Sequence, residues 1–258
     1  MVLDEEIKTN ISPFAMREGE IKTFDGKDGY VSINQIINKI NIGHITDIHF
    51  KILEIVNEFE FITSRQIYQI LEARGIDCKW QPTDNTKPVA MIKKRLAGNQ
   101  VIISYLRKVK AFDSYTVKPV LNAKQIGKTF KMHAGIKVSK AGKSAEILFE
   151  AVRREEDWEK KLIDRVRLLK DFFENFVPHD SGFATKPGLV LLCEDDKHTI
   201  ETFKLIVQNK LEISNTKIWF TTDLKQNNPS LADSLTEFVL DEETSKYKLQ
   251  ELKMKILE

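Results

Sequence analysis

One stretch of the chain is rich in lysine and arginine and almost free of acids. Between Lys79 and Lys143 there are fifteen basic residues against two acidic ones, Asp84 and Asp113, although the whole chain has a net charge of only +2. A continuous segment with so large a positive excess attracts polyanions, among them the phosphate backbone of nucleic acid. The charge pattern therefore predicts a segment that binds nucleic acid.

Two capped helices precede this basic stretch. Apolar residues recur at helical spacing over residues 47–59, after threonine and aspartate, which suit a helix N-terminus. Thr63 and Gln66 then have the spacing of a capping box, and a second amphipathic helix is expected to continue until Gly75.

A third helix and a hairpin are predicted within the basic stretch itself. The helix would run from Thr86 until Gly98 and Asn99 end it, with apolar residues inward and basic residues outward. Strands are expected over residues 101–105, where β-branched residues are frequent, and over residues 115–120. Two helices, a basic helix and a hairpin follow one another in a winged helix-turn-helix domain.

In such a domain the third helix enters the major groove of double-stranded DNA. Polar side chains before and at its start would read bases or hold phosphates, and the surrounding cations would neutralise phosphates. The predicted DNA contacts are Lys79, Gln81, Asn85, Thr86, Lys87, Met91, Lys93, Lys94, Arg95, Arg107, Lys108 and Lys110.

The C-terminal half has the alternation of a small α/β domain. Apolar strands are predicted over residues 189–193 and 217–221, with a helix over residues 197–209 between them, which indicates a short parallel sheet. The expected fold class is thus mixed α+β, a winged helix followed by a small α/β domain. Four parts are predicted: an N-terminal extension (1–43), the DNA-binding domain (44–140), a long connecting helix or helix pair (141–176), and the α/β domain with a C-terminal helix (177–258).

Acidic residues follow two of the expected strands, where open sheets usually bind ligands. Glu194, Asp196 and Asp223 could hold Mg²⁺ and give a metal-dependent nuclease, the first alternative function. However, Asp195 and Asp196 also suit the start of a helix, and no E-x-K lysine accompanies Glu194. We therefore expect no catalytic residue, no metal and no cofactor. A second alternative is an adaptor that docks on an acidic protein through its basic region.

Cysteine spacing and hydropathy indicate the cellular compartment of the protein. Cys78 and Cys193 lie far apart without zinc-ligand spacing, so neither a disulfide framework nor a zinc site is indicated. No apolar run is long enough to span a bilayer, and residues 1–10 are polar rather than signal-like. The expected location is the cytoplasm, without a membrane partner.

The run Ile62-Thr63-Ser64-Arg65-Gln66-Ile67, between an amphipathic helix and a basic helix, resembles the replication-relaxation family of bacterial mobile elements. The resemblance covers residues 44–120 and, in general plan only, extends to about residue 222. It implies a DNA-binding transcription regulator or a replication or transfer factor of a plasmid or integrative element, with an α/β part similar to a degenerate nuclease. Paired DNA half-sites further predict a homodimer, and a protein partner of the α/β domain stays open.

Overall fold

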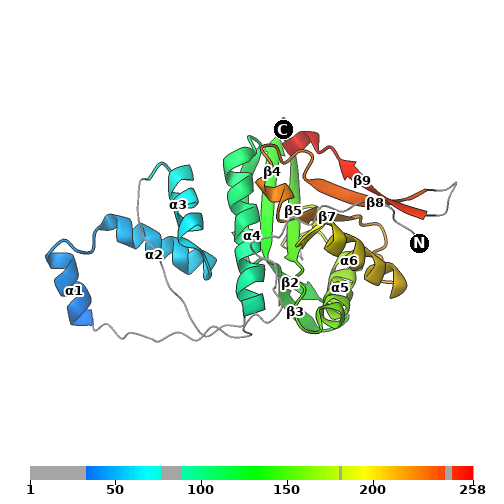
Figure 1. Cartoon of the computed structure of the whole chain (residues 1–258), viewed down its shortest axis with the longest axis horizontal. Helices are drawn as coiled ribbons and strands as arrows, with labels where there is room; N and C mark the ends of the chain where they lie inside the picture. Colours follow the sequence, from blue (N-terminus) through cyan, green and yellow to red (C-terminus); the bar gives the residue numbers. More distant parts are fainter. Residues whose placement is uncertain (1–32, 77–88, 180–181, 242–245, 258) are drawn as a thin grey trace.

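A computed structural model describes residues 33–76, 89–179, 182–241 and 246–257 (Figure 1). Its N-terminal part consists of helices. These are α1 (Ile33–Asn41), α2 (Asp47–Phe59), α3 (Ser64–Ala73) and the long α4 (Val89–Lys108). In Figure 1, α1 to α3 extend away from the sheet on the far side of α4.

Seven strands form one mixed sheet in the order β1-β4-β5-β6-β7-β8-β9. The three central strands are parallel, whereas the pairs on both sides are antiparallel. Their bounds are β1 (Phe112–Val117), β4 (Ala134–Lys140), β5 (Lys143–Ala151), β6 (Gly188–Cys193), β7 (Ile218–Thr222), β8 (Leu235–Asp241) and β9 (Lys246–Leu252). A separate antiparallel hairpin consists of β2 (Val120–Ala123) and β3 (Lys128–Lys131). The fold is therefore of the mixed α+β class.

Helices cover the sheet on both faces. α4 packs on β4 and β5 over one face, where η1 (Lys225–Asn227) and η2 (Lys255–Leu257) also lie. α5 (Trp158–Glu174) and α6 (Asp196–Gln208) pack over the other face. Two adjacent parallel strands must be joined by a crossover connection. α5 lies in the connection from β5 to β6, and α6 lies in the connection from β6 to β7. The sheet thus separates two hydrophobic cores (Figure 1).

Several predicted elements are confirmed. Helices α2 and α3 begin and end close to their expected positions, and β6, α6 and β7 match the predicted strand, helix and strand. The capping box is present in α3. Thr63 Oγ1 accepts a hydrogen bond from the Gln66 N–H at 3.2 Å, and Gln66 Oε1 accepts one from the Thr63 N–H at 3.1 Å.

The prediction for the third helix was wrong in its extent. Gly98 and Asn99 do not end α4 but lie in its middle, and residues 101–105 are helical rather than a strand. This β-branched run is buried between the sheet and the preceding helices, and such burial overrides a weak local propensity. The Asn99 amide donates to the Phe61 carbonyl oxygen at 2.5 Å, which fixes α4 to the end of α2.

The expected wing and domain boundaries also differ from the structure. The strand predicted at 115–120 overlaps β1, but β1 pairs with β4 rather than with residues 101–105. Residues 143–151 form β5 instead of the start of a connecting helix, and the predicted C-terminal helix is replaced by β9 and η2. Strands from both expected domains share one sheet because β5 pairs with β4 on one side and with β6 on the other.

Within the ranges given above, no helix is both long and apolar enough to cross a bilayer.

Gly98 provides a test of how closely α4 approaches the sheet. A Cβ atom at this position would lie 2.7 Å from the carbonyl oxygen of His133. Alanine favours a helix over glycine by about 1 kcal/mol, yet we expect Gly98→Ala to lower the free energy of unfolding by about 1–3 kcal/mol through overpacking. Urea unfolding followed by circular dichroism measures this. Met91→Ala, at an exposed position of the same helix, is the control with a change within about 0.5 kcal/mol. A Gly98→Ala protein as stable as the parent would contradict the close contact.

Candidate nucleic-acid interface

The twelve predicted DNA contacts do not form one surface. Lys79, Gln81, Asn85, Thr86 and Lys87 lie outside the described residues. The other seven belong to α4 or directly follow it, and most of α4 is packed against the sheet or against α3. The surroundings of these seven side chains therefore differ from one another.

Two cations of α4 are engaged inside the protein. Lys94 forms an ion pair with Glu155, which also binds Lys161 at 2.9 Å. Arg95 is 9% exposed and donates to the His133 carbonyl oxygen at 3.0 Å. Burial lowers the pKa of Arg95 to about 10, and the nearby Glu150 opposes this shift. Both side chains hold α4 on the fold, which contradicts the prediction that Lys94 faces a DNA groove and that Arg95 neutralises a phosphate beside it.

The end of α4 gives a similar result. Arg107 pairs with Glu72 of α3 at 3.0 Å, and Lys108 Nζ donates to the carbonyl oxygens of Gln226 and Asn228 at 2.8 and 2.9 Å. The remaining predicted contacts are accessible to different degrees. Lys93 is half-buried, whereas Met91 and Lys110 are exposed near opposite ends of α4. The predicted set is thus dispersed along a helix of 20 residues.

The structure instead gathers exposed lysines on the hairpin β2–β3. Lys124, Lys128 and Lys131 are exposed, and no acidic residue lies between Val120 and Lys131. The inward side of the hairpin is buried against α5 (Figure 1), through Leu121, Ala123 and Phe130. Lys128, although exposed, pairs with Ala123 on the face that carries Leu121 and Phe130, whereas Lys131 pairs with Val120 on the opposite face.

The hairpin is also firmly attached at its tip. The Gln125 N–H donates to Asp171 of α5 at 3.1 Å, and the Arg165 guanidinium stacks 4.5 Å above the ring of Phe130. None of these three lysines is among the DNA contacts predicted from the sequence. The signal that could have found the hairpin is Gly127, which adopts φ +69° in the turn between two short strands.

The carboxylates at the ends of the parallel strands are paired with arginines. Asp223 binds the fully buried Arg153 at 2.7 Å, and Glu194 lies 3.3 Å from Arg154. Asp196 is separate from them and lies 3.7 Å from Lys225. Over the described residues, no group of three or more histidine, cysteine, aspartate or glutamate side chains is arranged to hold a metal ion. The three carboxylates considered for Mg²⁺ thus occupy ion pairs of the fold.

The neighbouring groups are held in a fixed protonation state. Asp195 caps α6 by accepting from the His198 N–H at 2.7 Å. The His198 ring accepts from the Glu194 N–H at 3.2 Å, and burial lowers its pKa to about 3. Burial raises the pKa of the Cys193 thiol to about 12. At neutral pH this end of the sheet therefore holds a neutral imidazole and a neutral thiol.

A second buried polar cluster surrounds Glu150 between α4 and α5. Its carboxylate binds Arg165 at 2.7 Å and approaches His133 Nδ1 at 3.1 Å. Burial alone would raise the pKa of Glu150, but His133 and Arg165 lower it to about 2. Burial also lowers the pKa of His133. The Glu150 carboxylate is therefore ionised at neutral pH, and the Arg165 guanidinium balances its charge.

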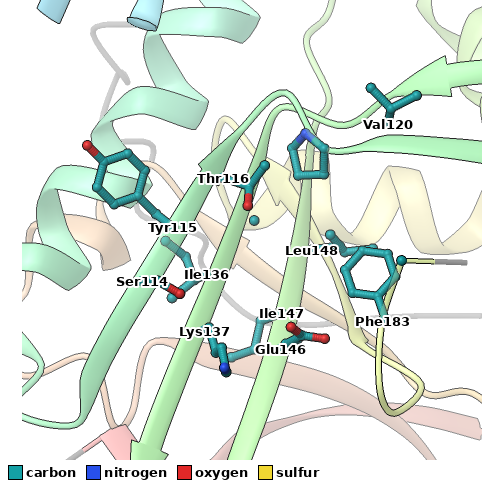
Figure 2. Close-up of a pocket in the computed structure, with 13 residues that line it drawn as sticks. Ser114, Tyr115, Thr116, Val120, Ile136, Lys137, Glu146, Ile147, Leu148 and Phe183 are labelled. Atoms are coloured by element: carbon teal, nitrogen blue, oxygen red, sulfur yellow. The ribbon is translucent and has the colours of Figure 1, made fainter. Parts of the chain in front are cut away.

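A pocket of about 240 Å³ opens on β1, β4 and β5 (Figure 2). Lys137 and Glu146 face each other across the two strands, with Phe183 at the opposite side of the pocket. Lys137 is 3.3 Å from Asp113, and burial raises the pKa of Glu146. Since one lysine and one glutamate line the pocket, it does not extend the basic surface.

Comparison with protein-family models, with curated proteins and with solved structures finds no match to this chain. The functional conclusion therefore depends on the residues and their arrangement.

The Glu150 cluster predicts how stability depends on pH. Because the pKa of Glu150 is about 2 when folded and 4.5 in the reference state, the unfolded chain binds more protons between these values. Stability should be complete above about pH 4.5 and fall by up to roughly 3 kcal/mol as the pH decreases toward 2. Urea unfolding at several pH values should show a shallower loss for Glu150→Gln.

The matched control for this experiment is Glu146→Gln. The pKa of Glu146 is raised, so its protonation on acidification favours the folded state, and its removal should not make the acid loss shallower. Equal pH slopes for the parent and Glu150→Gln would mean that the cluster does not depress the pKa of Glu150.

Proposed function

We propose that this protein binds double-stranded DNA and that the hairpin β2–β3 makes the main contact. The observation that carries the proposal is the set of exposed lysines on this hairpin, Lys124, Lys128 and Lys131. The major groove of B-DNA admits a two-stranded ribbon. Lysines on such a ribbon neutralise phosphates, and the exposed Asn122 and Thr129 are able to contact base edges.

The helices next to the hairpin complete the proposed surface. Lys118, at the base of the hairpin, forms an ion pair with Glu60 in the turn between α2 and α3. That turn spans residues 60–63, and turns of this length are usual in helix-turn-helix motifs. We therefore assign α2 and α3 to a helix-turn-helix and the hairpin to the role of its wing. The exposed Arg65 of α3 adds positive charge to this region, whereas Arg74 pairs with Glu58 at 3.2 Å.

The proposed process follows from the family resemblance of residues 62–67. It is transcription regulation, or replication or transfer, of a bacterial mobile element, carried out in the cytoplasm. All of these roles use the same physical property, which is binding to duplex DNA with an affinity that depends on salt.

We further propose that the DNA-binding form is a homodimer joined through α1. Four isoleucines at helical spacing are between 39% and 75% exposed on this helix, and Phe50 and Leu53 of α2 are also exposed, at 44% and 53%. α1 carries no acidic residue in its first turn and a single lysine in its last. Exposed apolar patches of this kind mark interaction surfaces, and the stripe suits a second copy of the same helix.

A protein partner of the α/β part is the second candidate function. An apolar pocket of about 340 Å³ lies between α6 and the β8–β9 hairpin, and Phe203, Phe238 and Tyr247 contribute to its wall. The Phe203 and Phe238 rings are stacked at 3.8 Å. Such a pocket suits an apolar anchor residue of a partner.

DNA binding is tested by fluorescence anisotropy with random and selected duplexes over a salt series. We expect the Lys128→Ala, Lys131→Ala double variant to bind DNA about tenfold more weakly at low salt. The slope of log affinity against log salt concentration should become shallower by about two, one for each phosphate contact that is lost. Lys143→Ala is the matched control, since this exposed lysine of the same basic segment lies at the other end of β4 and β5. Absence of binding at low salt, or equal effects of the control and the double variant, would reject the assignment.

The proposed dimer is tested by light scattering. Ile37→Ser combined with Ile40→Ser should convert a dimer mass into a monomer mass, because it removes apolar surface from the centre of the exposed stripe. Asn38→Ser, an exposed change on the same helix, should leave the mass unchanged. A monomeric parent protein would contradict the proposal.

A further inference from the structure

A further pocket, lined mainly by polar and charged residues, lies between α3 and α4. Its volume is about 540 Å³, which is within the usual range for small-molecule sites. Its walls come from the first two turns of α3, the second half of α4 and Asn227 of η1. Only one lining residue, Ile103, is apolar. We refer to this cavity as the α3–α4 pocket.

Positive charge in this pocket has no carboxylate opposite it among the lining residues. Arg65, Arg107 and Lys108 supply three cations. Lys108 is held in place by the carbonyl oxygens of Gln226 and Asn228. The pocket on β1, β4 and β5 differs, because its lysine is accompanied by a glutamate. The α3–α4 pocket is therefore suited to an anion.

Two of the three cations are available to such an anion. Arg65 is exposed, and no described residue pairs with it. Arg107 pairs with Glu72, but the two side chains are 38% and 55% exposed, and an exposed pair of this kind contributes little. A phosphate could take the place of Glu72, since guanidinium groups bind phosphate with two parallel hydrogen bonds. The N–H groups in the first turn of α3 add a partial positive charge on the same side.

Side-chain amides line the remainder of the pocket. Gln66 Nε2 donates to the Leu96 carbonyl oxygen at 2.9 Å, so this amide is fixed. Gln69 differs, because its Oε1 is buried and has no hydrogen-bond partner within the described structure. An unpaired buried acceptor is unfavourable, and turning the amide toward a ligand donor would relieve it. An amide that presents one donor and one acceptor together matches the edge of a nucleobase.

We propose that the α3–α4 pocket binds a mononucleotide. The phosphate lies between Arg65 and Arg107, and the base contacts the Gln69 amide. This inference does not depend on DNA binding by the hairpin, because Gln69 and Arg107 belong to α3 and α4, whereas Arg65 is shared with the proposed DNA surface. A nucleotide bound here contacts both helices at once and so links occupancy of the pocket to the position of α3 on α4.

Isothermal titration calorimetry of the full chain tests the proposal. The ligands are adenosine and guanosine 5′-monophosphate, with adenosine, guanosine and inorganic phosphate as partial ligands. We expect one or both mononucleotides to bind at least about tenfold more tightly than their parts, since phosphate and base contacts act together. Arg65→Ala should weaken binding by about tenfold or more, through loss of charge-assisted hydrogen bonds, and Gln69→Ala should reduce the preference between the two bases.

The matched control is Arg167→Ala, which replaces an exposed arginine of α5 that pairs with Asp164 at 3.0 Å. It should leave nucleotide affinity unchanged. No binding of either mononucleotide at millimolar concentration, or equal affinity of the parent and Arg65→Ala, would overturn the proposal.

Titration with a short DNA duplex shows whether the pocket binds a free nucleotide or a phosphate of the DNA backbone. If Arg65→Ala weakens duplex binding and neither mononucleotide binds, the cations serve DNA and the nucleotide proposal fails. If a mononucleotide binds and Lys128→Ala with Lys131→Ala leaves its affinity unchanged, the pocket and the hairpin are independent sites. Failure of the hairpin assignment would then leave the pocket proposal standing.

Discussion

The rest of the structure depends on the burial of α4 between the sheet and α3. Its central residues, from Val101 to Tyr105, are at most 1% exposed, and each large apolar side chain buried in this way contributes about 1.5–3 kcal/mol. Gly98 allows the helix to approach the start of β4, and Asn99 attaches it to the end of α2. Because α4 is fixed on two sides, it cannot present a broad basic face to a groove, and its cations are used for internal contacts.

Charge balance inside the fold explains why its acidic residues offer little chemistry. Arg153 with Asp223 and Arg165 with Glu150 are buried pairs in which each charge has a partner. An unpaired charge at such positions would be strongly destabilising. The carboxylates near the carboxyl ends of the parallel strands thus keep these arginines satisfied, while the neutral His198 completes the packing. Exposed lysines lie on the hairpin β2–β3, and Arg65, Arg107 and Lys108 line the α3–α4 pocket.

These two basic regions differ in shape and therefore in the anion that each would accept. The hairpin is a two-stranded ribbon with exposed lysines, which suits the extended backbone of a duplex and makes binding sensitive to salt. The α3–α4 pocket is concave and has amide groups beside its arginines, which suits a compact ligand with both phosphate and base. The ion pair between Lys118 and Glu60 connects the base of the hairpin to the turn before α3.

The sequence alone determined the elements whose signals are local. Helical periodicity and the Thr63–Gln66 capping box located α2 and α3, and a fully apolar run located β6. Charge counting located the basic stretch but not which lysines would be exposed. Tertiary structure decided that Val101–Tyr105 is helical, that β5 joins both halves in one sheet, and that the carboxylates Glu194 and Asp223 meet arginines. The physical reason is that strand pairing, burial and ion pairing join residues far apart in the chain, so that no local pattern specifies them.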